Sequence, residues 1–361
     1  MPLTNYKEAR PWAKAIQQMV SSRKMPPWFA ETAAVSFSND PRLSSAEVDA
    51  IANWVKQGAP EGPRLSTVAS KATPPSPFDL TLRMPTPVRV PARGEIPYQF
   101  VILPQRFDKD TWVRRVEVSP GVRGVVHHVV VYVRERGGAW LDGKPEGVPF
   151  SSPGATKSDI LAVYAPGQPA AEFPESMAKL IPAGAQIVLQ IHYTPNGKAV
   201  EDRTVVHLSY SKSTPSKRVL TLQIATTDFL IPAGESNHRV TAFGTLPNDA
   251  LLLGLFPHMH LRGKAFEYAV AQTGGRIEVL LRVKPYDFHW QLYYRLAEPR
   301  PLPKGTRLVC TAWYDNSRNN PRNPDPEADV RYGEPSTDEM MVGFFDIAVP
   351  AAMDKNSFFQ R

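Results

Sequence analysis

The sequence predicts a mainly β protein with a short helical segment at its N-terminal end. The 361 residues include 37 prolines, about twice the usual share, and proline disfavours long helices. From residue 78 onward, apolar and polar residues alternate with a period of two in short runs, which is the pattern of half-buried strands. Many short strands with no helices between them favour antiparallel β-sandwiches.

Residues 1–62 carry the helical pattern. Between Tyr6 and Ser21 apolar residues recur at spacings of three and four, as on one face of a helix, and the stretch RKMPPW at 23–28 then breaks it. A second helix is expected to begin after Ser44, a candidate N-cap that forms a capping box with Glu47, and to end at Gly58. The proline-rich residues 63–78 are predicted to be a linker.

The expected strands form two series separated by a polar hinge at 211–217. The first series comprises 98–103, 111–118, 125–133, 160–164, 186–193 and 204–210. The second comprises 218–224, 239–243, 251–256, 265–272, 277–283, 289–295, 307–314 and 342–347. Turns rich in proline and glycine separate the runs, which favours strand-to-strand connections over helical crossovers.

Composition excludes several classes of protein. The net charge is +7, but lysine and arginine are dispersed, so we expect no nucleic-acid partner. No apolar run has the length of a membrane span, and no signal peptide is visible at the first residues. Cys310 is the single cysteine, so an intrachain disulfide or a haem-attaching C-x-x-C-H motif cannot form within this chain. We expect Cys310 to be a buried, unreactive thiol.

The apolar run 251–256 leads into an H-x-H motif, His258 and His260. On a strand these two side chains leave the same face, and two imidazoles side by side make half of a metal site. A second cluster upstream, His127 and His128, lies inside a β-branched run. Adjacent strand residues face opposite ways, so both can reach one ion only if the strand is bulged or ends there.

Two further ligand candidates complete the pattern: His192, in the stretch QIHY, and Met340, in the stretch DEM. The grouping indicates two sites. The first would use three imidazoles, those of His127, His128 and His192. The second would use His258, His260 and the thioether of Met340, and a thioether favours Cu(I) over zinc or iron.

The order HH, QIHY, HMHLRGK, DEM resembles the copper type II ascorbate-dependent monooxygenases, the peptidylglycine and dopamine β-monooxygenase family. The resemblance covers roughly residues 76–361, and Gln190 and Tyr193 also fit the motif of the third histidine. It implies two tandem, jelly-roll-like antiparallel sandwiches, at 79–214 and 215–361. Each would hold one copper ion, with an open cleft between them.

The resemblance also implies a division of roles. The three-histidine copper would take electrons from ascorbate or a redox protein, and the copper at His258, His260 and Met340 would bind O2 and attack a C–H bond of a small-molecule substrate. Gln190 would support the first copper or its electron path; the alternative is a strand glutamine bonded to backbone. A periplasmic or secreted protein is expected from the same resemblance.

Three positions depart from the peptide-amidating members of that family. Phe256 stands where those enzymes carry an arginine that holds the peptide carboxylate, and Val342 and Phe344 replace an asparagine and a tyrosine. We therefore expect an apolar or aromatic substrate in place of a glycine-extended peptide.

Residues 1–62 resemble the C-terminal two-thirds of a small c-type cytochrome, with Met25 at the position of the axial methionine. Bacterial relatives of the copper enzymes are similar in carrying such a domain before the oxygenase. Because the haem-attachment motif is missing, no c-type haem is expected in this chain as written. Either the sequence begins late and the motif lies upstream, or the segment is a haem-free remnant in which Met25 is core.

Two other functions fit parts of the pattern. One is a non-catalytic copper-binding or electron-transfer protein on the same scaffold. The other is a sandwich module with structural zinc, against which the methionine ligand argues. The remaining histidines, at 207, 238 and 289, are interpreted as ordinary strand or turn residues, with His289 the one that could line the cleft.

Overall fold

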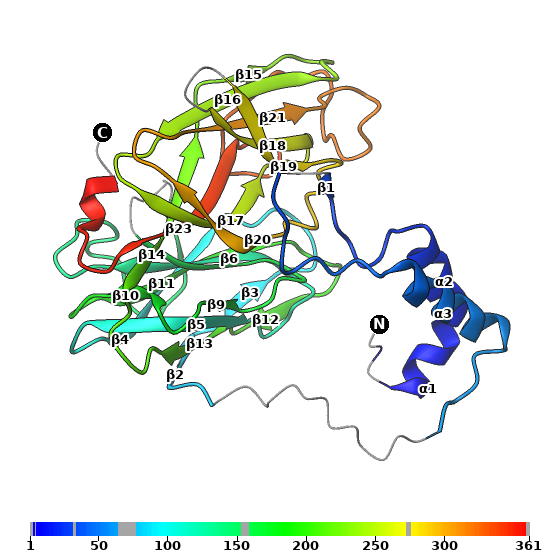
Figure 1. The fold of residues 1–361 in the computed structure, drawn as a ribbon, viewed down its shortest axis with the longest axis horizontal. Coiled ribbons are helices and arrows are strands. Elements are labelled where there is room, and N and C mark those ends of the chain that lie inside the picture. The colour runs from blue at the N-terminus through cyan, green and yellow to red at the C-terminus, as the bar shows by residue number, and fades with distance from the viewer. Residues whose placement is uncertain are drawn as a thin grey trace. The chain divides into compact units, whose positions relative to one another are not determined.

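The computed structural model describes residue 3 and residues 5–31, 34–63, 77–152, 159–271 and 276–358 (Figure 1). The chain divides into two compact units. A helical unit comprises Met1–Phe29 and Asn39–Pro77, and a β unit comprises Ala30–Ser38 and Phe78–Arg361. Most of the linker expected at 63–78 lies outside the described residues. Among those described, no helix has the length and apolar character needed to cross a membrane.

The helical unit confirms two helical stretches, with one interruption. The elements are α1 (Tyr6–Ala9), a 3-10 turn (Arg10–Trp12), α2 (Ala13–Ser21) and α3 (Ser45–Lys56). The single helix expected at 6–21 is interrupted at Pro11, which lacks the N–H that an α-helix uses. The capping box at Ser44 and Glu47 is present. Met25 lies in the loop after α2 with 40% of its surface exposed.

The described residues of the β unit form three larger sheets and two strand pairs. The first sheet has the order β7 (Phe150–Ser151), β4 (Gln99–Arg106), β11 (Gln186–Tyr193), β6 (Val126–Arg134) and β8 (Asp159–Tyr164). The second has the order β2 (Leu80–Arg83), β13 (Val205–Tyr210), β5 (Thr111–Ser119), β10 (Met177–Ile181), β14 (Lys217–Ala225), β23 (Val342–Pro350), β17 (Ala250–His258) and β20 (Tyr294–Leu302), with β9 (Ala171–Glu172) beside β5. The third has the order β1 (Ala30–Glu31), β19 (Ile277–Val283), β18 (Gly263–Ala271), β21 (Arg307–Tyr314) and β16 (His238–Thr245). The short pairs are β3 (Val88–Val90) with β12 (Val200–Asp202) and β15 (Leu230–Ile231) with β22 (Val330–Arg331), and a 3-10 turn (Lys355–Phe358) follows β23.

The long second sheet runs through both strand series. Its join is a short parallel pairing between β10 and β14, in which Met177 lies opposite Lys217 and Ala178 opposite Arg218. The other pairs of named strands are antiparallel. The sequence pattern did not predict β10, whose short run MAKLI includes a buried lysine. The boundary at residue 214 falls just before β14, and a division of the β unit there remains a prediction.

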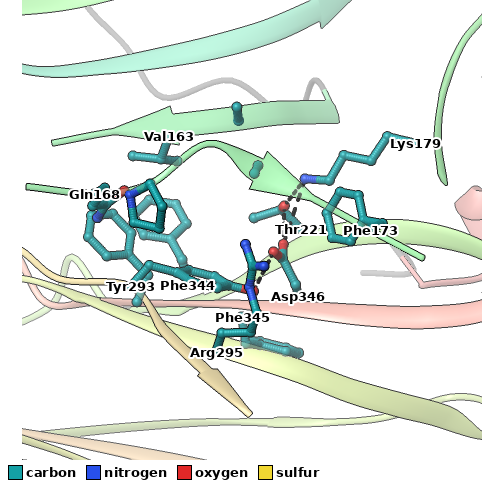
Figure 2. A pocket seen from close by; sticks show the side chains of 14 residues that line it. Val163, Gln168, Phe173, Lys179, Thr221, Tyr293, Arg295, Phe344, Phe345 and Asp346 are labelled. Atoms are coloured by element: carbon teal, nitrogen blue, oxygen red, sulfur yellow. Dashed lines mark hydrogen bonds and ion pairs between the residues drawn. The ribbon is translucent and has the colours of Figure 1, made fainter. Parts of the chain in front are cut away.

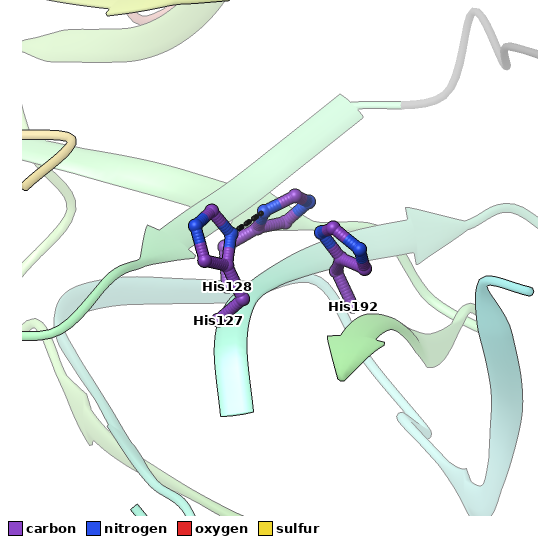
Figure 3. Close-up of side chains that lie close together, drawn as sticks. All are labelled: His127, His128 and His192. Carbon is purple, nitrogen blue, oxygen red and sulfur yellow. Dashed lines mark hydrogen bonds between the residues drawn. The ribbon is translucent and has the colours of Figure 1, made fainter. Parts of the chain in front are cut away.

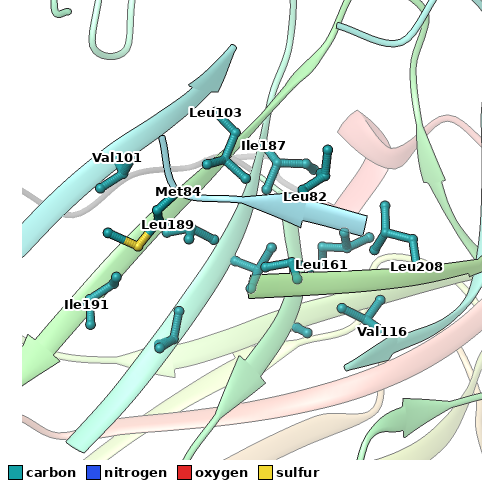
Figure 4. Packing of buried hydrophobic residues seen from close by; sticks show 14 of the residues in the cluster. Leu82, Met84, Val101, Leu103, Val116, Leu161, Ile187, Leu189, Ile191 and Leu208 are labelled. Carbon is teal, nitrogen blue, oxygen red and sulfur yellow. The ribbon is translucent and has the colours of Figure 1, made fainter. Parts of the chain in front are cut away.

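The first sheet packs face to face on the β2–β13–β5–β10 half of the second. The apolar cluster between them takes residues from both sheets, among them Val101, Leu189, Val116 and Leu208 (Figure 4). In the other half, β23 lies against β18 and β21. There the hydroxyl of Tyr268 donates to the carbonyl of Phe344 at 2.9 Å. Paired sheets with buried inner faces confirm a mainly β architecture of several packed sheets.

One predicted strand is wrong. Residues 289–293 are not a strand, and β20 begins only at Tyr294. The carboxylate of Asp287 accepts a hydrogen bond from the backbone N–H of His289 at 2.9 Å, which closes a local turn after Pro285. His289 therefore lies in a loop of the second strand series.

We predict that Gly343→Ala destabilises the β unit. A Cβ at this position would lie 2.5 Å from the sulfur of Cys310 and 3.0 Å from the ring of Tyr268, and both neighbours are fully buried. Overpacking of this kind costs about 1–3 kcal/mol of unfolding free energy. Urea denaturation followed by tryptophan fluorescence measures it. Gly138→Ala is the control, because its nearest contact would be 3.4 Å; equal midpoints for both variants would contradict the prediction.

Candidate metal centre

Strands β6 and β11 bring three of the expected histidines together. His128 lies directly opposite His192 in the antiparallel register, and the next pair along is Val126 with Tyr193. His127 is therefore the extra residue of a β-bulge, so its side chain is released from the strict alternation of the strand. The sequence predicted an irregularity at this pair, and the register confirms it.

The rings of His127, His128 and His192 converge (Figure 3). One ring nitrogen from each can be chosen so that all three lie within 4.8 Å of one another. The Nδ1 atoms of His127 and His128 are 3.2 Å apart. All three side chains are buried. This spacing lets three nitrogens face one ion.

Burial keeps these imidazoles neutral. It lowers the pKa of His127 to about 3 and that of His192 to about 4, with neighbouring histidines adding to the effect. Burial also lowers the pKa of His128 well below the ordinary value. A neutral imidazole presents one nitrogen with a lone pair, which is the form that ligates metals.

The surrounding contacts select which nitrogen is left for a ligand. His127 Nε2 lies 3.0 Å from the carbonyl oxygen of Phe288, so Nε2 carries the proton and Nδ1 keeps the lone pair. His192 Nδ1 is buried and has no hydrogen-bond partner. A buried nitrogen without a hydrogen-bond partner, beside two other ring nitrogens, fits the role of a metal ligand.

The second pair lies where β17 ends. The strand stops at His258, so His260 is outside it, in contrast to the expected strand placement of both. The backbone of Met259 between them is fixed by Tyr286, whose hydroxyl donates to the Met259 carbonyl and accepts from its N–H, both at 2.9 Å. The rings of His258 and His260 stand perpendicular, with centroids 5.2 Å apart.

Both Nδ1 atoms of this pair have partners. His258 Nδ1 lies 2.7 Å from Oε1 of Gln291, and His260 Nδ1 lies 3.2 Å from the carbonyl of Asp338. His260 Nε2 is buried without a partner. Burial lowers the pKa of both imidazoles. The pair therefore offers Nε2 atoms, whereas the bulged pair offers Nδ1.

Met340 lies in the loop that leads into β23. Its neighbour Asp338 contacts His260, and Val342 lies opposite His258 in the pairing of β23 with β17. The backbone of Met340 is held by Tyr314, whose hydroxyl donates to its carbonyl at 2.8 Å. Met340 is half-buried. It lies two residues after Asp338, which contacts His260, and two residues before Val342, which lies opposite His258.

Glu339 and Arg262 tie this loop to the H-x-H segment. The Glu339 carboxylate accepts from the backbone N–H of His260 at 2.9 Å and of Arg262 at 2.6 Å, and burial raises its pKa to about 8. The Arg262 guanidinium is buried and donates to Asn316 Oδ1 at 2.7 Å and to the carbonyl of Thr337 at 2.6 Å. These bonds hold the histidine pair and the methionine loop in one arrangement.

The two histidine groups adjoin each other. The rings of His128 and His258 are in edge contact, with centroids 5.5 Å apart. Phe288 lies against both groups, stacked on His127 at 4.1 Å and edge-on to His260 at 6.3 Å. The prediction of an open cleft between the two histidine groups is therefore wrong. The five histidines form one buried cluster.

The other candidate residues lie around this cluster. Gln190 Oε1 accepts a hydrogen bond from the hydroxyl of Tyr132 at 3.3 Å. This is a bond between side chains, whereas the alternative to a role at the first copper was a glutamine bonded to backbone. The ring of His289 lies 6.4 Å from that of His127. His207 is stacked on Phe78, and His238 begins β16, so neither joins the cluster.

Sequence reasoning missed Phe288, Gln291, Tyr286 and Tyr98. Tyr98 packs edge-on against His192 at 5.0 Å, and the other three come from the segment 286–291. The aromatic residues beside His289 were the available signal. The strand predicted at 289–295 included only Gln291 of these three residues, and it concealed that residues 286–291 form a loop beside the histidines.

Comparisons with known proteins agree with the second half of the site. Residues 218–346, which include His258, His260 and Met340, match the family model described as the copper type II ascorbate-dependent monooxygenase C-terminal domain. No curated protein sequence matches the chain.

Among solved structures, one of PNGF-II in the P21 space group matches at 12% identity with a TM-score of 0.28, covering 75% of this chain and 65% of that one. The infectious bursal disease virus VP2 subviral particle matches at 5% identity with a TM-score of 0.24, covering 77% and 73%. The chain thus spans less than two thirds of the PNGF-II structure, and scores this low carry no argument about its activity.

We predict that Arg262→Leu strongly destabilises the protein. The change removes the donor to the Thr337 carbonyl, leaves Asn316 Oδ1 with the amide of Asn323 alone, and removes the cation beside the buried Glu339. Breaking such a buried arrangement costs about 3–5 kcal/mol. Metal-free protein unfolded in urea gives the value. Arg318→Leu, at an exposed ion pair with Glu327, should cost less than about 1 kcal/mol; a similar loss in both would contradict the role of Arg262.

Proposed function

We propose that this protein is a copper-dependent monooxygenase that hydroxylates a C–H bond of a small apolar or aromatic substrate, using O2 and an external reductant such as ascorbate. The observation that carries the proposal is the cluster of five buried imidazoles, two of which leave a ring nitrogen without a partner. The match of residues 218–346 to a copper monooxygenase domain supports it.

The donor set fits two copper ions. His127, His128 and His192 would hold one ion through nitrogen alone. His258, His260 and Met340 would hold the other through nitrogen and a weak, soft thioether, which favours Cu(I). When bound, the pair of coppers would supply the two electrons and the activation of O2 that C–H hydroxylation requires.

The residues of the chain prepare this site in three ways. The Phe288 carbonyl and Gln291 fix the rings of His127 and His258, so the ligating nitrogens need no reorientation when the metal binds. Gln190, two residues before His192 on β11, would support the first group from the same face of the strand. Phe288 and Tyr98 cover the imidazoles and exclude water.

The proposed class of substrate rests on the position of two phenylalanines. The proposed location and the ancestry of the helical unit rest on the family resemblance. Phe256 and Phe344 lie opposite each other on neighbouring strands, their ring centroids 5.8 Å apart, and Phe344 is 6.5 Å from His258. An apolar surface beside His258 supports an apolar or aromatic substrate. A periplasmic or secreted location, and descent of the helical unit from a c-type cytochrome, belong to the same proposal.

We predict that metal-free protein binds about two equivalents of Cu(I) and that His258→Ala binds about one. The variant loses a ligand of the second site and should lose oxygenation, because the substituted residue belongs to the group proposed to bind O2. A competition titration with a Cu(I) chelator measures the stoichiometry. His238→Ala, outside the cluster, should keep both ions. A wild-type stoichiometry of one, or a tight preference for zinc, would reject the two-copper site.

We predict that Met340→Leu and His192→Ala fail differently. Met340→Leu keeps volume but removes sulfur, so it should weaken Cu(I) retention and turnover at the second site while ascorbate still reduces the first. His192→Ala should impair that reduction while the second site still binds carbon monoxide. Rapid mixing with ascorbate and infrared spectroscopy of the carbonyl adduct separate the two effects. Met353→Leu is the matched control, and wild-type turnover by Met340→Leu would show that the sulfur is not a ligand.

A further inference from the structure

A cavity of about 330 Å³ opens beside the three-histidine group, on the side of His192. It lies between the segment that leads into β4 and the loop 334–336, which precedes β23. Most of its lining is apolar, and two carboxylates and an imidazole complete it: Glu95, Ile96, Pro97, Tyr98, His192, Glu334 and Pro335. The volume is within the range of sites that hold one small organic molecule.

A second hollow, beside Phe256 and Phe344, does not have this room (Figure 2). Its volume is about 50 Å³, enough for a few water molecules. Its polar end is already satisfied within the protein, because Lys179 Nζ donates to the carbonyl of Ile160 at 3.0 Å and to Thr221 Oγ1 at 2.5 Å. We therefore place no ligand in this second hollow.

The strand register places the larger cavity against one ring of the three-histidine group. In the pairing of β11 with β4, Ile191 lies opposite Gln99, so Tyr98 comes next to His192. The ring of Tyr98 stands edge-on to that of His192, with centroids 5.0 Å apart. On the other side, Ser336 Oγ lies 3.4 Å from His192 Nε2. A molecule in the cavity would therefore contact the imidazole that we propose as a ligand of the first copper ion.

Glu95 supplies a hydrogen-bond acceptor at the rim of the cavity. Its side chain is exposed, and among the described residues no hydrogen bond or ion pair occupies its carboxylate. Glu334 already has an interaction within the protein, so the acceptor for a ligand is assigned to Glu95. An ionised carboxylate only accepts hydrogen bonds, and bonds to a charged acceptor are stronger than neutral ones. A ligand with hydroxyl donors therefore suits this rim.

The lining also decides the charge of the ligand. None of the residues that line the cavity is basic. An anion would have no counter-charge among them and would be repelled by the carboxylate of Glu95. Apolar walls with an aromatic ring favour a flat, uncharged ring. The cavity thus selects a neutral arene that carries hydroxyl groups over ascorbate, which is an anion at neutral pH.

We propose that this cavity binds a neutral dihydroxyarene of the hydroquinone class, with its ring against Tyr98 and a hydroxyl that donates to Glu95. As a binding site the assignment stands without copper; as the entry point of electrons it rests on the proposed function. A hydroquinone that becomes the quinone releases two electrons and two protons. The electrons would reduce two Cu(II) ions to Cu(I), and the protons would pass to the rim carboxylate or to water.

Ligand titrations of the metal-free protein test the proposal with three probes: hydroquinone, 2,5-dihydroxybenzoate and 1,4-dimethoxybenzene. We expect hydroquinone to bind at least about tenfold more tightly than the anionic benzoate and than the dimethoxy compound, which has no hydroxyl donor. The imidazole NMR signals of histidine-labelled protein, recorded without O2, give the dissociation constants. The signal of His192, identified by its loss in His192→Ala, should shift, and that of His238 should not.

Variants of the lining test which groups hold the probe. Glu95→Ala should weaken hydroquinone about tenfold and bring its affinity close to that of the benzoate, because both the acceptor and the repulsion are removed. Glu95→Gln keeps an acceptor oxygen and should weaken hydroquinone less. Ile96→Ala, which removes part of the apolar wall, should weaken hydroquinone and the dimethoxy compound alike. Glu298→Ala, at an exposed residue of β20, is the matched control and should change nothing. Thermal unfolding of each variant verifies that it is folded.

The outcomes separate this proposal from the proposed function. Equal affinity for hydroquinone and the benzoate, or hydroquinone binding that Glu95→Ala leaves unchanged, overturns the assignment of the cavity. If hydroquinone binds as described but copper-loaded protein consumes no O2 with hydroquinone or ascorbate and a panel of aromatic substrates, the binding site stands and the monooxygenase proposal fails. If copper-loaded protein consumes O2 with ascorbate and an aromatic substrate but hydroquinone does not bind, the function stands and the cavity assignment is wrong.

Discussion

The short parallel pairing of β10 with β14 fixes the arrangement of the β unit. It joins strands from both series into one long sheet, and two buried ion pairs reinforce it. Lys179 on β10 reaches Asp346 on β23, and Arg218 on β14 reaches Asp159 on β8 at 3.0 Å. Because a sheet resists sliding of its strands, this join sets the relative position of the two histidine groups, which come from opposite halves.

The histidine cluster shows how a fold can orient imidazoles in advance for the metal ions that we propose they bind. Burial keeps five imidazoles neutral, and hydrogen bonds to a carbonyl or an amide orient several of them. Leaving His192 Nδ1 and His260 Nε2 unpaired costs free energy in the metal-free protein. Binding of the proposed metal ions would offset that cost, since the same atoms would gain a partner. Selectivity among metals would then follow from the proposed donors, which are nitrogen-rich and include the thioether of Met340.

Much of the fold and of the site could be predicted from the sequence, for identifiable reasons. The apolar alternation around Val129 and Leu189 encodes β6 and β11 directly. Two adjacent histidines that share one ion already required either a bulge or the end of the strand, and the register shows a bulge at His127. Pairing between distant strands is not encoded locally. The parallel join at β10, the contact of His128 with His258 and the loop that places Phe288 and Gln291 all depend on long-range packing. The strand predicted at 289–295 failed because a local Asx turn overrode its β-forming residues.

Gly254 carries a consequence for how this sequence can change over evolutionary time. A Cβ there would lie 2.1 Å from the hydroxyl of Tyr293, the group that donates to Asp346. The missing side chain on β17 is therefore the space through which Tyr293, the residue just before β20, reaches its partner. Drift at these positions must be concerted: a lineage that acquires a larger residue at 254 would first have to shorten the side chain at 293, and would then need a new donor for the carboxylate at 346. The three positions form one inherited unit, although they lie far apart in the sequence.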